Sequence, residues 1–159
     1  MRSDKTIIES VKKVYNQIAP LFNSTRDYLW NDLKPLIRFV QEGDSVVDAG
    51  CGNGRLYQLF ERLQVQYIGF DQSEALIELA KKRFPSARFL VSELTHTRLQ
   101  EGIADVIFSI AAFHHLPSTE TRIEALKEMK RMMKEGGTIV MINWNLYSNW
   151  AREKGFKGD

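Results

Sequence analysis

Cysteine, proline and long apolar runs are scarce in this sequence. Among 159 residues there are one cysteine, four prolines and three histidines. A single cysteine excludes an internal disulfide framework and a zinc site built from cysteines. No apolar run approaches the roughly 18 residues of a membrane span, and the start, MRSDKTIIESVKK, is charged throughout and lacks a signal-peptide core. We therefore expect a cytoplasmic protein with no membrane partner.

An excess of charge of one sign is also absent. Lysine and arginine number 22 and aspartate and glutamate 20, which leaves a formal charge of +2. The isoelectric point near 8.7 permits nucleic-acid binding but does not argue for it, since strong binders usually carry a clear basic patch. The length predicts one domain, and the 43% hydrophobic content is enough for a core.

The most informative stretch that is present reads VVDAGCGNGRL, residues 46–56. Two valines suit a buried parallel strand, which ends at the acid Asp48. Glycines lack a Cβ atom, so the next loop can turn tightly and bring backbone N–H groups against a ligand. The candidate ligand-binding residues of this loop are Gly50, Cys51, Gly52 and Gly54.

Arg55 occupies the position where the dinucleotide fingerprint G-x-G-x-x-G has its third glycine, which counts against NAD or FAD. The loop also lacks the Gly-Lys-Ser/Thr ending of a P-loop, which counts against a nucleoside triphosphate. After the loop, apolar residues recur at helical spacing and predict a helix packed on a sheet. These residues are Leu56, Leu59, Phe60 and Leu63.

A second acid follows the next predicted strand. Residues 67–70 are strand-like, Asp71 stands at their carboxyl end, and Gln72 comes next. Ligands of doubly wound sheets bind at the carboxyl ends of strands, where an acid can hold both ribose hydroxyls. Asp71 is therefore a candidate ribose-binding residue.

The remaining core residues alternate between predicted helices and strands. One helix begins after Ser73 and is stopped by Pro85, and another begins at Pro117-Ser118 and ends at Gly136-Gly137. Strands are predicted at 88–91, 105–109 and 138–142. On the later helix we expect four apolar side chains to point inward, namely Ile123, Leu126, Met129 and Met133. The fold class is α/β, a Rossmann-like doubly wound and mainly parallel sheet of five strands.

Two helices are predicted before the first strand, one ended by Pro20 and one from about Tyr28 to Val40. They cannot belong to the βα repeat, so we expect them to cap the carboxyl ends of the strands as a lid. The single domain would then comprise a helical arm (1–43), an α/β core (44–143) and a tail (144–159).

The order D-A-G-C-G-N-G, then G-F-D, resembles motifs I and II of class I S-adenosylmethionine-dependent methyltransferases. The resemblance implies S-adenosylmethionine as cofactor and S-adenosylhomocysteine as product. Glu93 stands where the family usually has an aspartate that accepts from the adenine N6 amine, and the N–H of Leu94 is then expected to reach N1. Ser109 starts the loop that, in this family, faces the transferable methyl group.

His114 and His115 follow in that loop. Adjacent side chains diverge, so both are not expected to bind one metal, and no metal site is predicted. No carboxylate nearby in sequence completes a triad. His115 is kept as a candidate catalytic residue, with polar packing as the alternative.

A narrower resemblance covers about residues 14–144. The segments VYNQIAPLFNSTR, SIAAFHH and LKEMKRMMKEGGT, with Trp30 after Arg26, resemble the tRNA wobble-uridine carboxymethyl methyltransferases, including the domain fused to AlkB-type dioxygenases. Asn31 departs from the proline often found there, as Glu93 departs from aspartate. The implied reaction esterifies the carboxylate of 5-carboxymethyluridine in tRNA. A small-molecule methyltransferase of quinone or metabolite type and a non-catalytic cofactor-binding subunit remain alternatives.

A carboxylate acceptor is ionised near pH 7 and needs no base, so positioning can carry the catalysis. An arginine fork is the natural carboxylate clamp. Arg26 is the candidate, for either the acceptor or the methionine carboxylate of the cofactor. Arg55 is a weaker candidate, since its stem is expected to turn towards solvent. Tyr15 either closes over the cofactor, in this family's manner, or belongs to the helix core.

The family's sheet usually has seven strands, and only five are predicted here. Either the natural protein continues beyond Asp159 or the fold is a minimal version. Both leave an uncovered sheet edge near Trp144, Tyr147 and Trp150, and exposed edges invite pairing. We expect self-association or an activator subunit at this edge.

Overall fold

In the computed structural model, residues 3–144 and 153 are described. The strands are β1 (Ser45–Ala49), β2 (Gln66–Asp71), β3 (Arg88–Val91), β4 (Ala104–Ile110) and β5 (Met133–Ile142). The α-helices are α1 (Asp4–Thr25), α2 (Glu74–Arg83) and α3 (Thr119–Met132). The 3-10 helices are η1 (Asn31–Phe39), η2 (Arg55–Leu59) and η3 (Phe113–His115).

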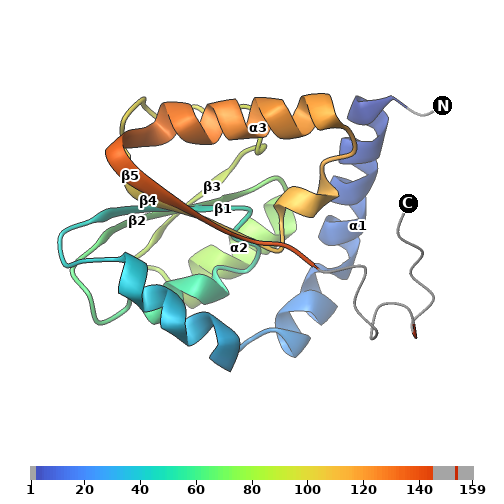
Figure 1. Cartoon of the computed structure of the whole chain (residues 1–159). Coiled ribbons are helices and arrows are strands. Elements are labelled where there is room, and N and C mark those ends of the chain that lie inside the picture. Colours follow the sequence, from blue (N-terminus) through green and yellow to red (C-terminus); the bar gives the residue numbers. More distant parts are fainter. Residues whose placement is uncertain (1–2, 145–152, 154–159) are drawn as a thin grey trace.

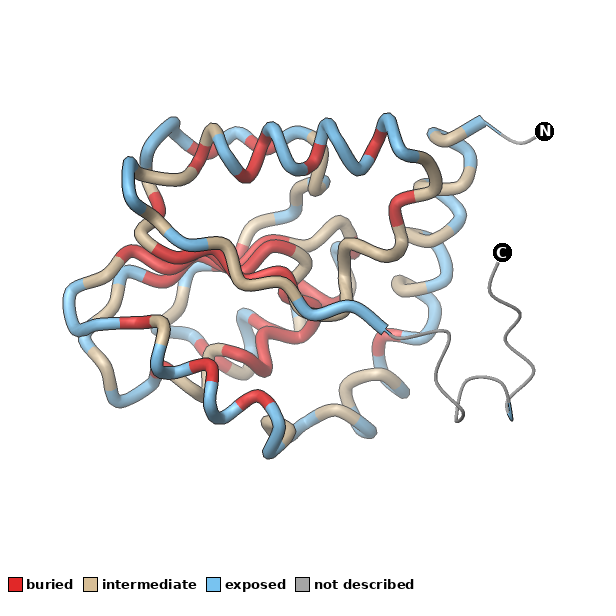
Figure 2. Tube along the Cα trace, in the orientation of Figure 1, coloured by how far each residue is buried: buried red, intermediate tan, exposed pale blue. Residues whose placement is uncertain are grey.

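The strands form one parallel sheet in the order β3-β2-β1-β4-β5, which confirms the predicted Rossmann-like fold class. Helix α3 covers one face, while α2, η1 and η2 cover the other (Figure 1). Burial is concentrated in the sheet and in the sides of the helices that face it (Figure 2). The strand order reverses between β1 and β4, and such a switch point is where doubly wound sheets bind ligands.

The N-terminal arm contains a longer helix than expected, because Pro20 does not end it. Pro20 lies inside α1, which continues to Thr25. A proline removes one backbone donor and crowds the preceding turn. However, Tyr15 and Phe22 pack edge to face on either side of it, with ring centroids 5.8 Å apart. This packing and the hydrogen bond from Asn53 to the Asn23 side chain help to hold the residues after the proline in the helix.

Two predicted helices are short 3-10 segments. The second arm helix is η1, which begins at Asn31 and contains Pro35. Proline has no N–H, so Pro35 cannot make the bond to the Asn31 carbonyl that an α-helix would need. The helix after the glycine loop is only η2, where Gly54 has a left-handed conformation and no side chain caps the start. Leu56 and Phe60 are nevertheless buried as expected.

Helix α3 ends at Met132, before the predicted stop at Gly136-Gly137. Met133 is already extended, with φ −80° and ψ 136°, and β5 begins there beside β4. Lys134 Nζ lies 2.6 Å from Asp105 Oδ2 on β4. Strand pairing and this ion pair therefore outweigh the helical periodicity of the segment.

The buried face of α3 also differs from the prediction. Ile123 and Leu126 are 46% and 43% exposed, so the expectation that both point inward is wrong. The buried residues are Thr121, Ala125, Glu128, Met129 and Met132. A buried glutamate at the centre of this face is unexpected from sequence, since charged residues are almost never fully buried unless paired.

Glu128 is buried because three groups satisfy its carboxylate. Oε1 accepts from the Thr97 backbone N–H at 2.7 Å and from Thr97 Oγ1 at 2.8 Å. Both oxygens also accept from Arg131, through Nη2 at 2.7 Å and Nε at 2.8 Å. The hydrogen bonds from Arg131, more than any other partner, lower the pKa of Glu128 to about 2. The cluster ties the loop after β3 to α3.

Replacing Glu128 with Gln should therefore lower the free energy of unfolding by about 1.5–3 kcal/mol at pH 7, the range for a hydrogen bond to a charged group. The folded pKa lies below the unfolded value near 4.5, so this stability is present above that pH and is lost as pH falls towards 2. Urea unfolding at pH 7 and pH 3 measures both effects. Glu124→Gln on the exposed side of α3 is the control; equal effects of the two substitutions at pH 7 would contradict the interpretation.

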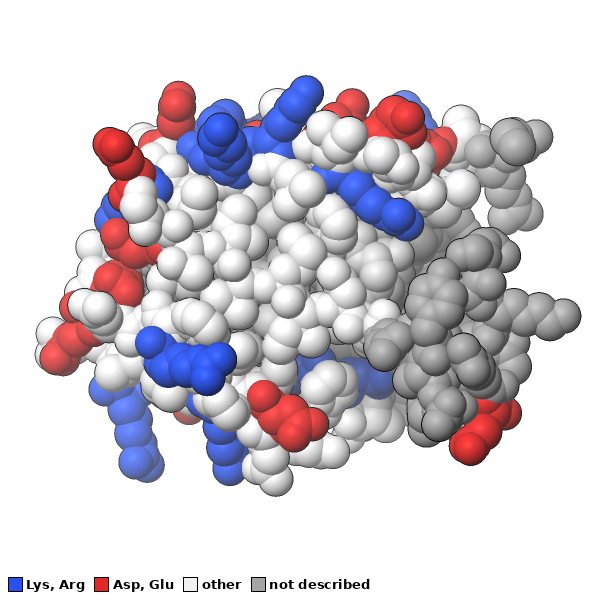
Figure 3. Space-filling model, viewed as in Figure 1, with Lys and Arg blue, Asp and Glu red and all other residues white. Residues whose placement is uncertain are grey.

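Strand β5 lies at an edge of the sheet, and among the described residues it pairs only with β4. Ile142 and Trp144 at its end are 36% and 44% exposed. In Figure 3, charged side chains surround a central uncharged area over this strand. Tyr147 and Trp150, which we also expected at this edge, lie outside the described residues.

Within residues 3–144, no helix combines the length and apolar character that crossing a membrane requires. In the same part of the chain, His, Cys, Asp and Glu side chains form no group of three or more that could hold a metal ion.

Candidate active site

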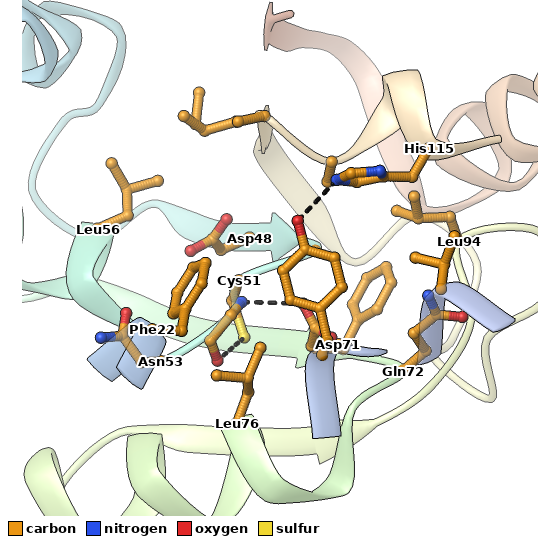
Figure 4. A pocket seen from close by; sticks show the side chains of 18 of the residues that line it. Phe22, Asp48, Cys51, Asn53, Leu56, Asp71, Gln72, Leu76, Leu94 and His115 are labelled. Carbon is orange, nitrogen blue, oxygen red and sulfur yellow. Dashed lines mark hydrogen bonds between the residues drawn. The ribbon is translucent and has the colours of Figure 1, made fainter. Parts of the chain in front are cut away.

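A cavity of about 410 Å³ lies at the carboxyl ends of the strands, with α1 as one wall. This volume falls within the range of roughly 300–1,000 Å³ for small-molecule sites. Figure 4 shows side chains converging on the cavity from the arm and from the loops after β1 and β2. The predicted site residues that line it are Tyr15, Arg26, Asp48, Gly50, Cys51, Gly52, Asp71, Gln72, Glu93, Leu94 and His115.

Two predicted site residues are not among those lining the cavity. Ser109 is buried within β4 and its Oγ has no hydrogen-bond partner, while its neighbour Ile110 does line the cavity. Successive strand residues point to opposite faces, which explains the difference. Gly54 closes the turn with φ +75°, and a Cβ there would lie 2.8 Å from the Phe89 ring. Its role is close packing of the loop on β3.

Asp71 fixes the glycine loop. Its Oδ2 accepts from the Gly52 N–H at 3.0 Å and its Oδ1 from the Ser73 N–H at 2.9 Å. Burial raises the pKa of Asp71, and these backbone donors oppose the rise. Each carboxylate oxygen has a second lone pair, so the side chain can still accept from the two hydroxyls of a ribose.

Gly50 brings the loops after β1 and β4 together. Its φ is +82°, and a Cβ at this position would lie 2.2 Å from the Ala112 Cβ. Only glycine fits such a close approach. The adjacent Ala111 has φ 55°, a value that is uncommon outside glycine. Cys51 beside this contact is buried, and burial raises the pKa of its thiol, so it is unsuited to act as a nucleophile.

Asp48 is a buried carboxylate without a cationic hydrogen-bond partner. It is 2% exposed and accepts a 2.8 Å hydrogen bond from the Tyr67 hydroxyl. Burial raises the pKa of Asp48 to about 7, although the Tyr67 hydrogen bond and the charge of Arg55 oppose the rise. A ligand that brings a positive charge to this carboxylate would be stabilised.

Polar contacts along α1 hold the arm over the cavity. The Asn53 side-chain amide donates to the Asn23 side chain and to the backbone carbonyl of Arg26, both at 3.0 Å. Asn16 accepts from the Ser73 hydroxyl at 2.7 Å. The arm is thereby joined both to the glycine loop and to the start of α2, which is what a lid over the ligand requires.

Tyr15 and His115 join the arm to the loop after β4. Tyr15 Oη lies 2.9 Å from His115 Nε2, a bond marked in Figure 4. Burial, and secondarily the charge of His114, lowers the pKa of His115 to about 4. The ring is thus neutral near pH 7, and its Nε2 shares this hydrogen bond with the Tyr15 hydroxyl. A histidine of this pKa is a weak base, so the geometry favours positioning over proton abstraction.

This contact predicts pH-dependent stability. The pKa of His115 is lowered from about 6.5 to about 4, so the folded state binds fewer protons and loses stability as pH falls between those values. His115→Gln keeps a hydrogen-bonding group for the Tyr15 hydroxyl but does not titrate. Its thermal midpoint should fall less between pH 7 and pH 5 than that of the wild type. After allowance for solvent screening, a linkage of about 1 kcal/mol corresponds to about 2–4 °C. The control is His96→Gln at an exposed position; parallel pH slopes in all three proteins would refute the prediction.

Two arginines line the cavity. Arg26 is partly buried, lies over the Phe22 ring at 4.7 Å and donates to Thr25 Oγ1 at 3.1 Å. Arg55 does not turn to solvent as expected, because its guanidinium stacks 3.7 Å over the Trp30 ring. It is 9% exposed, and burial lowers its pKa to about 10. Trp30 comes from the arm, so the sequence near Arg55 holds no sign of this contact.

Glu93 and Leu94 lie at the β3 end of the cavity. Glu93 is exposed and pairs through its backbone with His96 in an isolated bridge. Its longer side chain therefore has room to adjust, which the departure from aspartate requires. Asn16 and Asn53 were missed by sequence reasoning, because an asparagine in a helix or a loop carries no mark of its distant partner.

The cavity combines an apolar lining with charged side chains of both signs. Asp71 ends β2, Asp48 lies in β1 and Arg55 begins η2. Asp48 and Arg55 are in none of the salt bridges of the described residues, which join other side chains. An acid and a base without ionic partners in one cavity suit a ligand that carries both charges.

Comparison with known proteins matches residues 47–141 to the family described as Methyltransferase domain. The mouse protein named tRNA (carboxymethyluridine(34)-5-O)-methyltransferase ALKBH8 is 33% identical over 144 residues, 91% of this chain and 21% of the relative. A Saccharomyces cerevisiae protein named tRNA (carboxymethyluridine(34)-5-O)-methyltransferase is 33% identical over 144 residues, 91% of this chain and 51% of that relative. The chain thus spans between about a fifth and half of the length of these curated relatives.

Among solved structures, a similar chain comes from the complex between the Haloferax volcanii Trm112 methyltransferase activator and the putative methyltransferase. Its TM-score is 0.72 with 25% identity, over 82% of this chain and 59% of that chain.

Proposed function

Because this chain belongs to the methyltransferase-domain family, we propose that it methylates the carboxylate of 5-carboxymethyluridine in tRNA, using S-adenosylmethionine. It is a methyltransferase of the S-adenosylmethionine-dependent class, and the predicted resemblance to the tRNA carboxymethyluridine enzymes is confirmed. The substrate rests on relatives of which this chain spans only part. A cytoplasmic location is part of the same proposal.

The observation that carries the proposal is the position of Arg26. Its guanidinium lies on the wall of the cavity that also contains the glycine loop, and its described partners are a ring and a hydroxyl. A guanidinium binds a carboxylate through two parallel hydrogen bonds. An acceptor carboxylate held by Arg26 would therefore lie beside the cofactor site without help from a base.

When bound, S-adenosylmethionine supplies an electrophilic methyl group on a sulfonium sulfur. Asp71 and the Gly50–Gly54 loop would hold the ribose, and the residues after β3 would hold the adenine. Tyr15 and His115, which line the cavity and are hydrogen-bonded to one another, would shield the carboxylate oxygen from water. The chain would then accelerate the reaction mainly by holding that oxygen in position next to the methyl group.

The test is a transfer assay with the purified chain, methyl-labelled S-adenosylmethionine and tRNA that contains 5-carboxymethyluridine. Labelled methyl ester at that nucleoside after digestion supports the proposal. tRNA with unmodified uridine at the same position is the control. Label entering a metabolite extract but not tRNA points to the small-molecule alternative, and cofactor binding without transfer in any mixture points to a non-catalytic subunit.

For partners, we propose that the β5 edge pairs with a second copy of the chain or with an activator subunit. The Haloferax volcanii neighbour is in a complex with an activator, which supports a partner without locating it here. The mass from light scattering should rise above that of the monomer with concentration, and Ile142→Lys should reduce the rise. Ile37→Lys, at a similarly exposed isoleucine on η1, is the control. A constant monomer mass across the dilution series would count against self-association.

A further inference from the structure

Arg55 is a buried cation that forms no salt bridge with any of the residues that the structure describes. It is 9% exposed, its Nη1 is buried with no hydrogen-bond partner, and it lines the cavity. Leaving a buried donor unsatisfied is costly, and more so for a charged group. The stack on Trp30 fixes the plane of the guanidinium but satisfies none of its N–H groups. A bound anion would satisfy them.

Asp48 is the corresponding anion, a buried carboxylate that forms no salt bridge among the described residues. Its carboxylate is 2% exposed, and its described hydrogen-bond partner is the neutral Tyr67 hydroxyl. It is close enough to Arg55 for each charge to affect the other, yet the two form no salt bridge. Asp48 and Arg55 therefore line the cavity as a carboxylate and a guanidinium that are not paired with one another.

We infer that Arg55, held by Trp30, binds the α-carboxylate of the cofactor's amino-acid tail while Asp48 binds its α-ammonium. The inference rests on the proposed use of S-adenosylmethionine. It assigns the carboxylate of the cofactor to Arg55 and the carboxylate of the acceptor to Arg26. Arg55 is the more buried, so it suits the ligand part that enters first and deepest. Arg26 is less buried and sits on the arm, so it remains available for the acceptor.

The two arginines also repel one another, since the charge of Arg26 contributes to the lowered pKa of Arg55. Two cations in one cavity are stabilised together when each receives an anion. The amino-acid tail and the acceptor carboxylate supply one anion each. The site is thus matched in charge to a reaction in which both components carry a carboxylate.

Calorimetry on the full chain can separate these contributions with three ligands. S-adenosylhomocysteine carries both charges of the tail, its decarboxylated analogue carries only the ammonium, and 5′-methylthioadenosine carries neither. Arg55→Met should weaken S-adenosylhomocysteine binding about 10- to 100-fold, as expected for losing a charged hydrogen-bonding partner. It should change binding of the other two ligands less than about twofold, a difference under 0.5 kcal/mol.

Asp48→Asn should weaken binding of the two ligands that carry the ammonium and leave binding of 5′-methylthioadenosine unchanged. Arg55→Lys keeps the charge and should recover part of the affinity, while Arg62→Met, at an exposed arginine outside the cavity lining, is the control and should leave all three affinities nearly unchanged. Thermal unfolding of each variant confirms that it is folded before its binding is compared.

Equal weakening of all three ligands by Arg55→Met would mean that Arg55 only supports the fold, and the inference would fail. It would also fail if Arg26→Met, and not Arg55→Met, produced the carboxylate-specific loss. Failure of the wild-type chain to bind any of the three ligands would instead overturn the proposed use of S-adenosylmethionine.

Discussion

Replacing Arg26 with Met is expected to slow methyl transfer to a carboxylate acceptor by about a hundredfold, or about 2.7 kcal/mol. Methionine keeps much of the length of the side chain but removes the charge and the fork, and a hydrogen bond to a charged group contributes about 1.5–3 kcal/mol. Arg26→Lys keeps the charge without the bidentate geometry and should fall between wild type and Arg26→Met. Single-turnover rates at saturating cofactor measure the effect.

The cofactor affinity of the Arg26 variants decides what Arg26 holds. Nearly normal binding of S-adenosylhomocysteine with slow transfer places the acceptor on Arg26. If binding of S-adenosylhomocysteine is weakened while binding of 5′-methylthioadenosine is unchanged, Arg26 holds the methionine carboxylate of the cofactor. If neither transfer nor binding changes by more than about twofold, Arg26 binds no carboxylate in the site. The proposal that the arm acts as a lid over the reacting groups would then fail as well.

The second large effect is expected at Asp71. Asp71→Ala should lower the affinity for S-adenosylhomocysteine by at least about a hundredfold, because two hydrogen bonds from ribose hydroxyls to a carboxylate are lost, at about 1.5–3 kcal/mol each. The same substitution frees the Gly52 and Ser73 N–H groups that the carboxylate now holds. Binding of 5′-methylthioadenosine, which keeps the ribose, should fall in parallel.

Asp71→Asn separates the two contributions in part, since one amide oxygen can still accept but the amide nitrogen cannot. It should bind more tightly than Asp71→Ala and more weakly than the wild type. Calorimetry for affinity and thermal unfolding for the loop measure both roles, with Asp32→Asn on the exposed side of η1 as the control. Unchanged cofactor affinity in Asp71→Ala would sink the assignment of the ribose site.

The α/β core could be predicted because its determinants are local. Alternation of short apolar strands with helical periodicity, and an acid at the end of each of the first two strands, follow from neighbouring residues alone. The loop from Gly50 to Gly54 needs glycine locally, because Gly50, Gly52 and Gly54 all have left-handed conformations. Such short-range constraints are legible in a sequence.

The wrong predictions concern places where distant residues compete with local preference. Pro20 lies inside α1, where the Tyr15–Phe22 contact and a hydrogen bond from the distant Asn53 help to hold the turn after it. Helix α3 ends and β5 begins at Met133 because β4 offers a pairing partner. On α3, Ile123 is exposed and Glu128 is buried. Glu128 can be buried because Thr97 and Arg131 donate hydrogen bonds to its carboxylate, which periodicity alone would place in solvent.

By itself, the sequence determined the alternating strands and helices of the α/β core, the glycine loop and the two acids that point to a nucleoside ligand. Only the tertiary structure decided how the side chains of the site meet. Tyr15 reaches His115 across 100 positions of the chain, and Trp30 turns Arg55 inward from an arm that precedes the sheet. The physical reason is that a hydrogen bond or a ring stack acts over a few ångströms. Which residues come that close depends on the packing of the arm against the sheet.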